Sequence, residues 1–430
     1  MRTHLDLNTD SRRSALHRTA RIACVGLLAL LLTGNALAAG QSSARSMAMG
    51  GAYLSLASGV DAARYNPANL GLSRYHQTGL EVVGFGVNIS NNSISLGDYN
   101  RYTGAILTDA DKRELLDKIP SDGLNLIADV EASALSVSRG PFVLSVTAIG
   151  VADVNLSKDI VELLFNGNAF GQEIELTGSY SDAVAYVQTG LSYGRQVANI
   201  GQRRLAVGAT VKYLRGLAVE EISELEGSVN TLETGFSGDG RMVARTATGG
   251  SGFALDLGGT LEFNRDYTIG LCIKNFLSNI SWSNNTEEHG YLFSFDTMTV
   301  DNMEDDYVVS EDYTKDIAGF STKLPATMTI GVANVTGELL WAVDWQQGFR
   351  TGAGSTTKPR LAAGLEWNKL GFLPLRAGFA AGGNKGSAFS FGSGLRLAAF
   401  RLDVAAQTGS SLSPYSTRGL NFALATGFVF

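Results

Sequence analysis

Apolar and polar residues alternate with a period of two along most of the chain after residue 77. In the last such segment, Leu420, Phe422, Leu424, Phe428 and Phe430 share one phase, and small or polar residues fill most of the other. A period of two predicts a strand with one apolar face and one small or polar face. The alternation predicts fourteen strands, at 78–90, 130–139, 141–155, 180–195, 203–216, 251–263, 267–282, 326–335, 338–347, 359–367, 373–381, 387–397, 400–408 and 419–430.

The connections between these strands alternate in length. The stretches 91–129, 156–179, 217–250 and 283–325 are long, whereas Gly140 and the turns that follow every second strand are short. In a transmembrane barrel short turns lie on the periplasmic side and long loops lie outside. The sequence therefore predicts an all-β fold, a fourteen-stranded antiparallel transmembrane β-barrel over residues 78–430, with short helices in its extracellular loops.

Charged residues fall mainly in the phase opposite to the apolar one. A Lys or Arg on the lipid face near the midplane costs about 2–4 kcal/mol, so these residues are expected in the lumen. There they either form ion pairs that fill the lumen and hold the N-terminal residues, or line a polar permeation path. The predicted lumen charges are Lys212, Asp256, Glu262, Lys274, Asp344, Arg360, Glu366, Arg376, Arg396, Arg401 and Asp403.

Residues 1–38 have the features of a secretory signal peptide. Arg12, Arg13, Arg18 and Arg21 precede an apolar run at 22–32, and the residues 35–38 offer an Ala-x-Ala cleavage site. The run is shorter than the roughly 20 residues that a transmembrane helix needs. Cleavage would leave 29 Lys and Arg against 39 Asp and Glu, a net charge of about −10. This charge argues against nucleic acid as a partner, and secretion combined with a barrel predicts the outer membrane of a Gram-negative-type bacterium.

Residues 39–77 do not alternate, and part of this segment resembles a known motif. The segment 47–52 reads Met-Ala-Met-Gly-Gly-Ala, and Asn-Pro-Ala follows some fifteen residues later. This order is similar to the N-terminal hatch of the FadL/TodX-type hydrophobic-compound channels and of the related PorV-type outer-membrane barrels. The resemblance implies a hatch, or plug, at residues 39–77 with Arg45, Met47, Met49, Gly50, Gly51, Asp61, Arg64, Asn66, Pro67 and Ala68 as its characteristic residues.

Two long loops each contain a predicted amphipathic helix. Thr108 and Asp111 can form a capping box before the first helix, and Ser157 can cap the second. An apolar stripe on an exposed helix has to be buried against something. The two stripes either pack on one another as a lid or form a landing site for a hydrophobic ligand, with Leu115, Leu116, Ile119, Val161, Leu164 and Phe165 as the candidate ligand-binding residues.

The segment 419–430 also resembles the closing strand of bacterial outer-membrane barrels. In such barrels the insertion machinery reads an aromatic residue at the end of this strand. The resemblance implies an insertion signal made of Phe422, Leu424, Phe428 and Phe430. The partners expected on these grounds are the lipid of the outer membrane and the insertion machinery.

No catalytic or metal-binding pattern occurs after residue 38. His76 and His289 are far apart in sequence, and no Gly-x-Ser-x-Gly motif, zinc-type spacing or phosphate-binding loop is present. The acidic loop 301–316 matches no calcium-binding spacing and is interpreted as a solvated loop, with cation binding left open. We therefore expect a protein that is not an enzyme and has no cofactor or resident metal.

The resemblance implies one of two functions. In FadL-like channels a hydrophobic molecule is captured among the extracellular loops, enters the barrel, and leaves sideways through a gap in the wall when the hatch shifts. PorV-like barrels instead act as scaffolds that receive secreted or surface proteins, and no solute crosses them. We expect a monomeric channel of the first kind, with the scaffold as the alternative.

Overall fold

Antiparallel pairing closes the sheet on itself. The computed structural model describes residues 43–167, 171, 173–232, 235–298, 308–413 and 415–430, so the predicted signal peptide lies outside the described residues. β1 (Gly79–Asn91) pairs with β2 (Leu124–Arg139) on one side and with β17 (Gly419–Val429) on the other. The ring continues through β3 (Phe142–Leu156), β5 (Tyr180–Ile200), β6 (Arg203–Leu232), β7 (Gly235–Phe263), β8 (Tyr267–Met298), β11 (Thr327–Asn334), β12 (Leu339–Gly348), β13 (Arg360–Trp367), β14 (Leu375–Gly382), β15 (Ala388–Leu397) and β16 (Phe400–Gly409).

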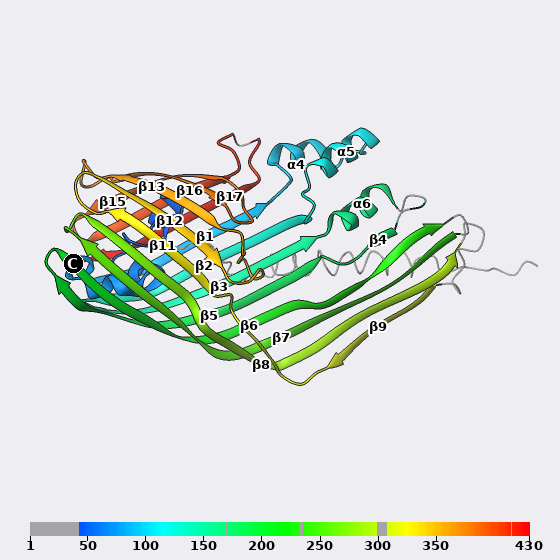
Figure 1. Cartoon of the computed structure of the whole chain (residues 1–430), viewed down its shortest axis with the longest axis horizontal. Helices are drawn as coiled ribbons and strands as arrows, with labels where there is room; N and C mark the ends of the chain where they lie inside the picture. Colours follow the sequence, from blue (N-terminus) through cyan, green and yellow to red (C-terminus); the bar gives the residue numbers. More distant parts are fainter. Residues whose placement is uncertain (1–42, 168–170, 172, 233–234, 299–307, 414) are drawn as a thin grey trace, which may run out of the picture. The chain divides into compact units, whose positions relative to one another are not determined.

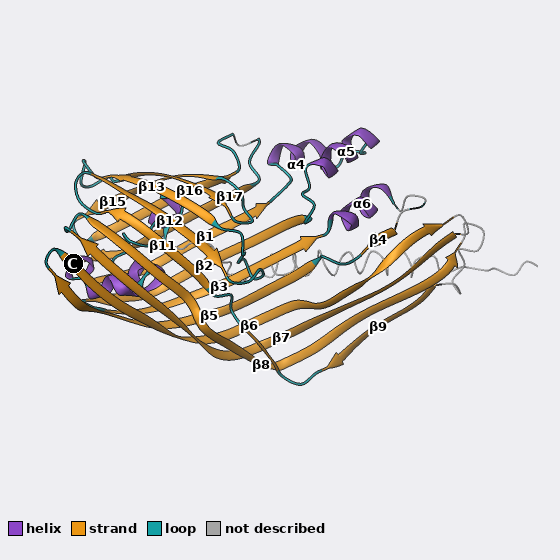
Figure 2. Ribbon diagram, viewed as in Figure 1, coloured by secondary structure: helices purple, strands orange, loops and turns teal. Residues whose placement is uncertain are grey.

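The prediction of fourteen antiparallel ring strands is confirmed (Figures 1 and 2). We call the end of the barrel with the short turns the turn end, and the end with the long connections the mouth end. Outward residues such as Phe253, Leu361 and Phe391 leave more than half of their surface exposed, whereas the alternate residues point inward. On β17, Phe422 and Phe428 point outward, Leu424 is partly exposed, and Phe430 follows the strand.

The prediction of long loops is wrong for two regions, because strands run through them. β6 and β7 continue through 217–250 as a hairpin, and β8 continues to Met298 and pairs with β9 (Val308–Asp316). Both phases of 217–226 carry glutamates, so the alternation that marks a half-buried strand is missing there. Two short strands, β4 (Glu173–Glu175) and β10 (Phe320–Thr322), were also missed, and β2 begins six residues earlier than predicted. Of the acidic loop 301–316, residues 308–316 form β9 and the rest lies outside the described residues.

Two helices of the mouth end begin at the capping residues that predicted them. The Thr108–Asp111 capping box starts α5 (Asp109–Asp117), and Ser157 caps α6 (Lys158–Asn166), so both predictions are confirmed. A further helix, α4 (Leu96–Tyr102), begins with a second capping box and was not predicted. Within the described residues, no helix has the length and apolar character needed to cross a bilayer.

The segment 43–77, called here the N-terminal segment, lies inside the ring. It consists of α2 (Ala44–Ala48), α3 (Val60–Tyr65) and the 3₁₀ turns η1 (Pro67–Gly71) and η2 (Ser73–Tyr75). α2 contacts β14 to β17, whereas η1 contacts β5 to β7. Inward glycines make room for it: a Cβ on Gly378 would lie 2.1 Å from the backbone nitrogen of Gly50, and one on Gly208 would lie 2.4 Å from Pro67. The segment therefore bridges opposite walls of the barrel.

Candidate functional site

A buried carboxylate fixes the first helix of the N-terminal segment to the wall. Glu366 on β13 is fully buried and accepts hydrogen bonds from Arg45 at 2.6 and 2.9 Å. Arg376 contacts the same carboxylate at 2.6 Å and Arg396 contacts it at 3.3 Å. Arg376 also pairs with Asp403 at 2.5 Å. Because three cations share Glu366, this carboxylate is the centre of the network that closes one side of the lumen.

A second ion-pair cluster holds α3. Arg64 pairs with Asp61 at 3.3 Å and donates to Glu81 of β1 at 2.9 Å. Glu131 of β2 lies 3.8 Å from the same guanidinium, and the hydroxyl of Ser133 donates to Glu81. Arg64 and Glu81 are each less than one-tenth exposed, so the pair is shielded from water. This cluster joins the N-terminal segment to the wall formed by β1 and β2.

Backbone groups of the segment are also bound by wall charges. Asp344 accepts hydrogen bonds from the amides of Tyr53 at 2.7 Å and Leu54 at 2.8 Å, and Arg360 donates to the carbonyl of Gly50 at 3.0 Å. Asp344 and Arg360 therefore hold the chain that follows α2. The remaining predicted lumen charges also have protein partners. Glu262 binds Arg74 and Arg204, and Lys212 pairs with Asp256. Lys274 lies 5.0 Å from the ring centroid of Tyr65, and Arg401 donates to the carbonyls of Ala398 and Phe400.

The Asn66-Pro67-Ala68 motif packs against three neighbouring strands. Asn66 is fully buried; its amide nitrogen donates to the Gly259 carbonyl and the Thr260 hydroxyl, and its oxygen accepts from the Ala68 amide. A Cβ on Gly258 would lie 2.1 Å from that oxygen. Met47 and Met49 are buried as well, and Gly50 and Gly51 have φ values of 70° and 92° that favour glycine. Their role as a movable hatch stays a prediction.

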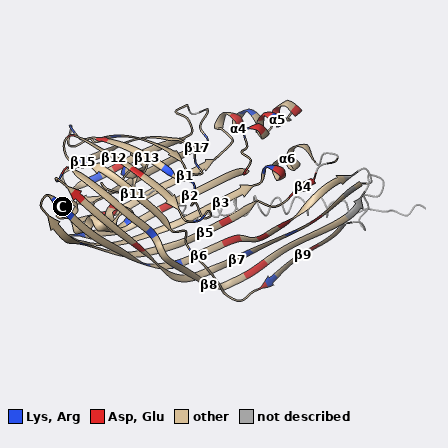
Figure 3. Cartoon of the chain, viewed as in Figure 1, with Lys and Arg blue, Asp and Glu red and all other residues tan. Residues whose placement is uncertain are grey.

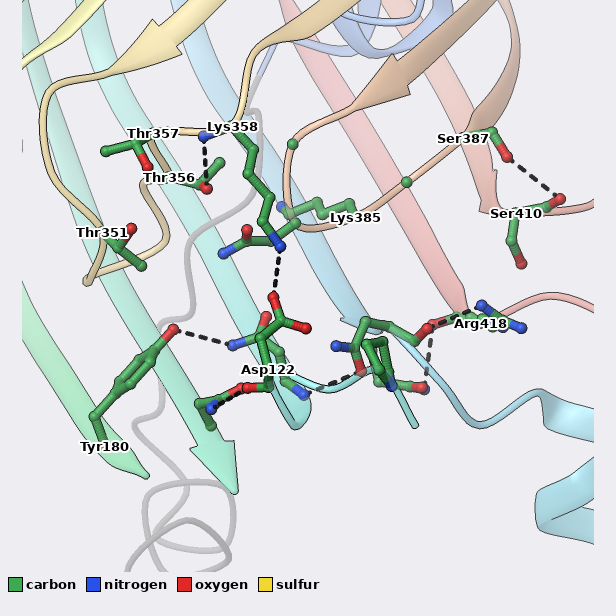
Figure 4. A pocket seen from close by; sticks show the side chains of 18 of the residues that line it. Asp122, Tyr180, Thr351, Thr356, Thr357, Lys358, Lys385, Ser387, Ser410 and Arg418 are labelled. Carbon is green, nitrogen blue, oxygen red and sulfur yellow. Dashed lines mark hydrogen bonds and ion pairs between the residues drawn. The ribbon is translucent and has the colours of Figure 1, made fainter. Parts of the chain in front are cut away.

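Two adjoining cavities occupy the lumen between the N-terminal segment and the mouth end. The cavity at the mouth has a volume of about 590 Å³ and is lined by Tyr180, Lys358, Lys385 and Arg418 among others (Figure 4). The deeper cavity, of about 350 Å³, reaches Met47 of α2. Lys358 and Lys385 line both, so the two cavities adjoin each other. Ligand sites commonly have volumes of about 300–1,000 Å³, so this space is the candidate functional site.

The loop between β12 and β13, residues 349–359, crosses this space. We call it the cross-barrel loop, because β12 and β13 lie roughly opposite β2 and β3 in ring order. Its tip is a tight turn in which Gly354 donates to Asp153 of β3 at 3.2 Å. Lys358 donates to Asp122 at 2.6 Å, as Figure 4 shows, and Lys385 of the next mouth loop donates to Asp129 of β2 at 2.6 Å. Both basic and acidic residues also occur along the ring strands (Figure 3). The loop narrows the way from the mouth to the deeper cavity.

The apolar stripes of α5 and α6 pack on one another. Leu116, Ile119 and Val161 form a buried cluster, against which Leu124, Leu156 and Phe165 pack. Leu115 is buried too, whereas Leu164 is 70% exposed. This packing agrees with the interpretation of the two stripes as covering each other. A ligand-binding role for these six residues stays a prediction.

The wall itself is irregular beside α3, a feature that sequence reasoning missed. Relative to β17, β1 has one extra residue at Val82, and relative to β3, β2 has one extra residue between Ser133 and Val137, where Leu135 has a φ of 52°. Such bulges bend a strand and leave a local break in the hydrogen-bond ladder. The two bulges lie opposite each other, since Glu81 pairs with Ser136 and Val83 with Ala134. No glycine or proline at Val82 or Leu135 signals them.

Comparisons with known proteins agree with this architecture. A family model described as a family of unknown function, DUF5723, matches residues 67–248. No curated protein matches the chain. The structure of the toluene transporter TbuX of Ralstonia pickettii is 14% identical, with a TM-score of 0.51, over 92% of this chain and 99% of that chain. A FadL homologue of Pseudomonas aeruginosa is 12% identical, with a TM-score of 0.50, over 91% and 99%.

The chain has the fold of the FadL/TodX-type barrels. At these identities the likeness concerns the fold, so the contents of the lumen have to be judged from this chain's own residues. In this chain the two cavities lie between the N-terminal segment and the mouth end.

We expect acid to loosen the cross-barrel loop. The pKa of Asp122 lies below its usual value, because the hydrogen bond from Lys358 stabilises the carboxylate. A lowered pKa means that the pair contributes fully above about pH 4 and is lost as the pH falls through the lowered value. Single-channel conductance in planar bilayers should rise about 2–5-fold between pH 7 and pH 2, as expected for losing an exposed pair.

Substitution of Asp122 should distinguish the effect of this pair from that of other carboxylates that gain a proton in acid. Asp122→Asn is expected to show the raised conductance already at pH 7 and no further rise at pH 2. Asp109→Asn on α5 is the control, because Asp109 is 93% exposed and only 4.0 Å from Lys112. If Asp122→Asn keeps the full response to pH, the Lys358–Asp122 contact does not restrain the loop.

Proposed function

We propose that the protein is an outer-membrane channel that takes up hydrophobic small molecules. The observation that carries this proposal is the pair of adjoining cavities between the mouth and the N-terminal segment, the deeper of which is lined by Glu131 of the bulged strand β2. A ligand entering at the mouth would pass the cross-barrel loop and reach the deeper cavity. From there it would leave sideways between β2 and β3 once α3 moves away from Glu81.

The outer face of the ring supports a membrane location. Leucine, phenylalanine, valine and isoleucine residues on this face expose large parts of their side chains, from Phe253 on β7 to Phe391 on β15. A soluble monomer rarely exposes a continuous apolar surface of this kind, whereas lipid covers it in a barrel. The outer membrane and a monomeric state are parts of the same proposal.

The proposed side exit can be tested by straightening the wall. Deleting both Val82 and Leu135 gives β1 and β2 the same number of residues as β17 and β3 across the irregular region. In cells that produce the protein, uptake of the hydrophobic fluorophore N-phenyl-1-naphthylamine should be faster than in cells without it. The double deletion should bring uptake down to the level without the protein.

The matched control keeps both bulges and changes only their side chains. Val82→Ala combined with Leu135→Ala should leave uptake unchanged, because the extra residues remain. Rapid uptake through the straightened barrel would place the exit elsewhere. Uptake by cells with the unchanged protein that is no faster than uptake by cells without it would reject the channel.

A scaffold for secreted or surface proteins is the alternative. The feature that favours it is the extension of β6, β7, β8 and β9 past the ends of their ring neighbours, since β6 pairs with β5 only as far as Glu221. Shortening both hairpins, by replacing residues 222–244 and 289–314 with two-residue turns, should leave fluorophore uptake intact if the protein is a channel. A scaffold should instead lose its surface protein and show no protein-dependent uptake before or after shortening.

A further inference from the structure

A row of polar side chains lies at one level of the deeper cavity, across neighbouring strands. Asn88 of β1 is the register partner of Asn421 of β17, which pairs in turn with Gln407 of β16 and then Ser390 of β15. Asn421 donates to the Gln407 oxygen at 2.6 Å, and Gln407 donates to the Ser390 hydroxyl at 2.7 Å. At the other end Asn88 donates to Asp129. We call Asn88, Asn421, Gln407 and Ser390 the amide row.

The direction of these hydrogen bonds leaves two acceptors unused. The amide nitrogens of Asn88 and Asn421 are both engaged, but their side-chain oxygens find no donor within the described part of the chain. Asn88 is 4% exposed and Asn421 is 8% exposed, and both line the deeper cavity. Buried carbonyl oxygens without a partner are rare and call for an explanation. Each oxygen itself exposes less than 1 Å², so a molecule in the cavity that donates hydrogen bonds would satisfy both once the two side chains turn toward it.

Another part of the wall of the same cavity is apolar. It is formed by Ile149 and Val151 of β3, by Val184 and Tyr186 of β5, and by Leu324 next to β11. These residues pack into one hydrophobic cluster. The cavity therefore has an apolar part and a hydrogen-bonding part, which fits a ligand with two chemically different ends.

The charged groups at the cavity already have protein partners. Lys385 binds Asp129, Lys358 binds Asp122, and Arg360 donates to the Gly50 carbonyl. Glu131 lies 3.8 Å from Arg64. A charged ligand end would have to replace one of these contacts, whereas a hydroxyl can use the two free oxygens without breaking any.

We infer that the ligand is an amphiphile with an uncharged, hydroxyl-bearing head that donates to Asn88 and Asn421, and an apolar tail that lies against β3 and β5. This inference rests on the proposed channel and names the class of molecule that it takes. It separates the chain from a carrier of plain hydrocarbons, which would leave both oxygens unpaired. It also separates it from a carrier of carboxylates, because a carboxylate offers these oxygens no donor.

Three probes with the same eight-carbon chain test the head group. Octyl glucoside has hydroxyls, octanoate has an anionic head without donors, and octyltrimethylammonium has a cationic head without donors. Binding is measured by calorimetry to the full chain in lipid nanodiscs, below micelle-forming concentrations, and the heat of binding to empty nanodiscs is subtracted. Octyl glucoside is expected to bind about tenfold more tightly than the other two probes.

The variants Asn88→Leu and Asn421→Leu remove one free oxygen each and should weaken octyl glucoside binding by about tenfold. Asn368→Leu is the matched control, because Asn368 also donates to a carboxylate, that of Glu366, and also has an unpartnered oxygen, but lies at the turn end outside the cavity. Its binding should equal that of the unchanged protein. If a leucine variant fails to fold, as judged by its heat-dependent migration in gel electrophoresis, Asn421→Ala removes the same oxygen in a smaller side chain.

Each result is decisive for the head group. Equal binding of all three probes, or tighter binding of octanoate, would overturn the inference. So would unchanged octyl glucoside binding in folded Asn88 and Asn421 variants. Fluorophore uptake that persists in any of these cases keeps the channel while rejecting its ligand class, whereas absent uptake rejects the channel itself.

Discussion

Replacing Glu366 with glutamine is expected to lower the free energy of unfolding by about 3–5 kcal/mol. The carboxylate is fully buried between Arg45, Arg376 and Arg396, so its removal leaves three guanidinium groups with little water and fewer counter-charges. Removing one partner of a buried ion pair is costly because the remaining charge stays desolvated. Urea unfolding of the barrel in lipid vesicles, followed by tryptophan fluorescence, measures the loss.

Glu338→Gln is the control for this prediction. Glu338 is also at the turn end and also faces a cation, but its side chain is 65% exposed and lies 4.0 Å from Lys369. An exposed pair of this kind contributes about 0–1 kcal/mol, so the unfolding curve should hardly move. Equal losses in the two variants would mean that the Glu366 network does not fix α2 to the wall.

The alternation of side chains predicted most of the ring, because a strand with one apolar outer face keeps its period of two wherever that face is continuous. Phe253, Leu361 and Phe391 mark this face both in the sequence and in the structure. The pattern fails where β6 to β8 continue beyond the ring, because glutamates such as Glu220 and Glu221 occupy both phases there. Local capping chemistry predicted α5 and α6 for a similar reason, since Thr108, Asp111 and Ser157 act on their nearest neighbours in sequence.

The arrangement of the lumen could not be predicted in this way. The sequence marks Arg45 and Glu366 as charged residues, but their pairing joins positions 321 residues apart and depends on how the N-terminal segment enters the ring. The cross-barrel loop is equally hidden, because its contacts reach strands from the opposite side of the barrel. The wall bulges arise at Val82 and Leu135, residue types that are ordinary in strands. The free oxygens of Asn88 and Asn421 depend on which neighbour takes each amide nitrogen.

The lumen has two parts that differ in what fills them. Near the turn end, ion pairs and buried amides bind the N-terminal segment to the wall. Above Met47 lies a space with one apolar wall, one hydrogen-bonding wall and a loop across its entrance. Ion pairs in the lumen therefore do not argue against the proposed transport, because they lie mainly in the part that the N-terminal segment fills, while the proposed ligand occupies the other part.

Replacing Gly258 with valine is expected to destabilise the protein and to release the N-terminal segment from β7. The substitution tests whether close packing against inward-facing glycines holds this segment in place. A Cβ at Gly258 would lie 2.1 Å from the side-chain oxygen of Asn66 and 3.1 Å from the amide of Ala68. Overpacking and the loss of the Asn66 hydrogen bonds together should cost about 2–5 kcal/mol. The segment should then detach from β7, so limited proteolysis should cut within residues 43–77 and channel conductance should rise.

Gly259→Val supplies the matched control at the next position of the same strand. A Cβ there meets no atom within 4 Å, because Gly259 points to the opposite face of the wall. Valine is favoured over glycine in strands by up to about 1 kcal/mol, so this variant should be as stable as the unchanged protein or slightly more stable. Cleavage and conductance should stay at the original level. If the two valine variants behave alike, close packing against the wall does not hold the segment in place, and the ion pairs of Arg45 and Arg64 alone would have to do so.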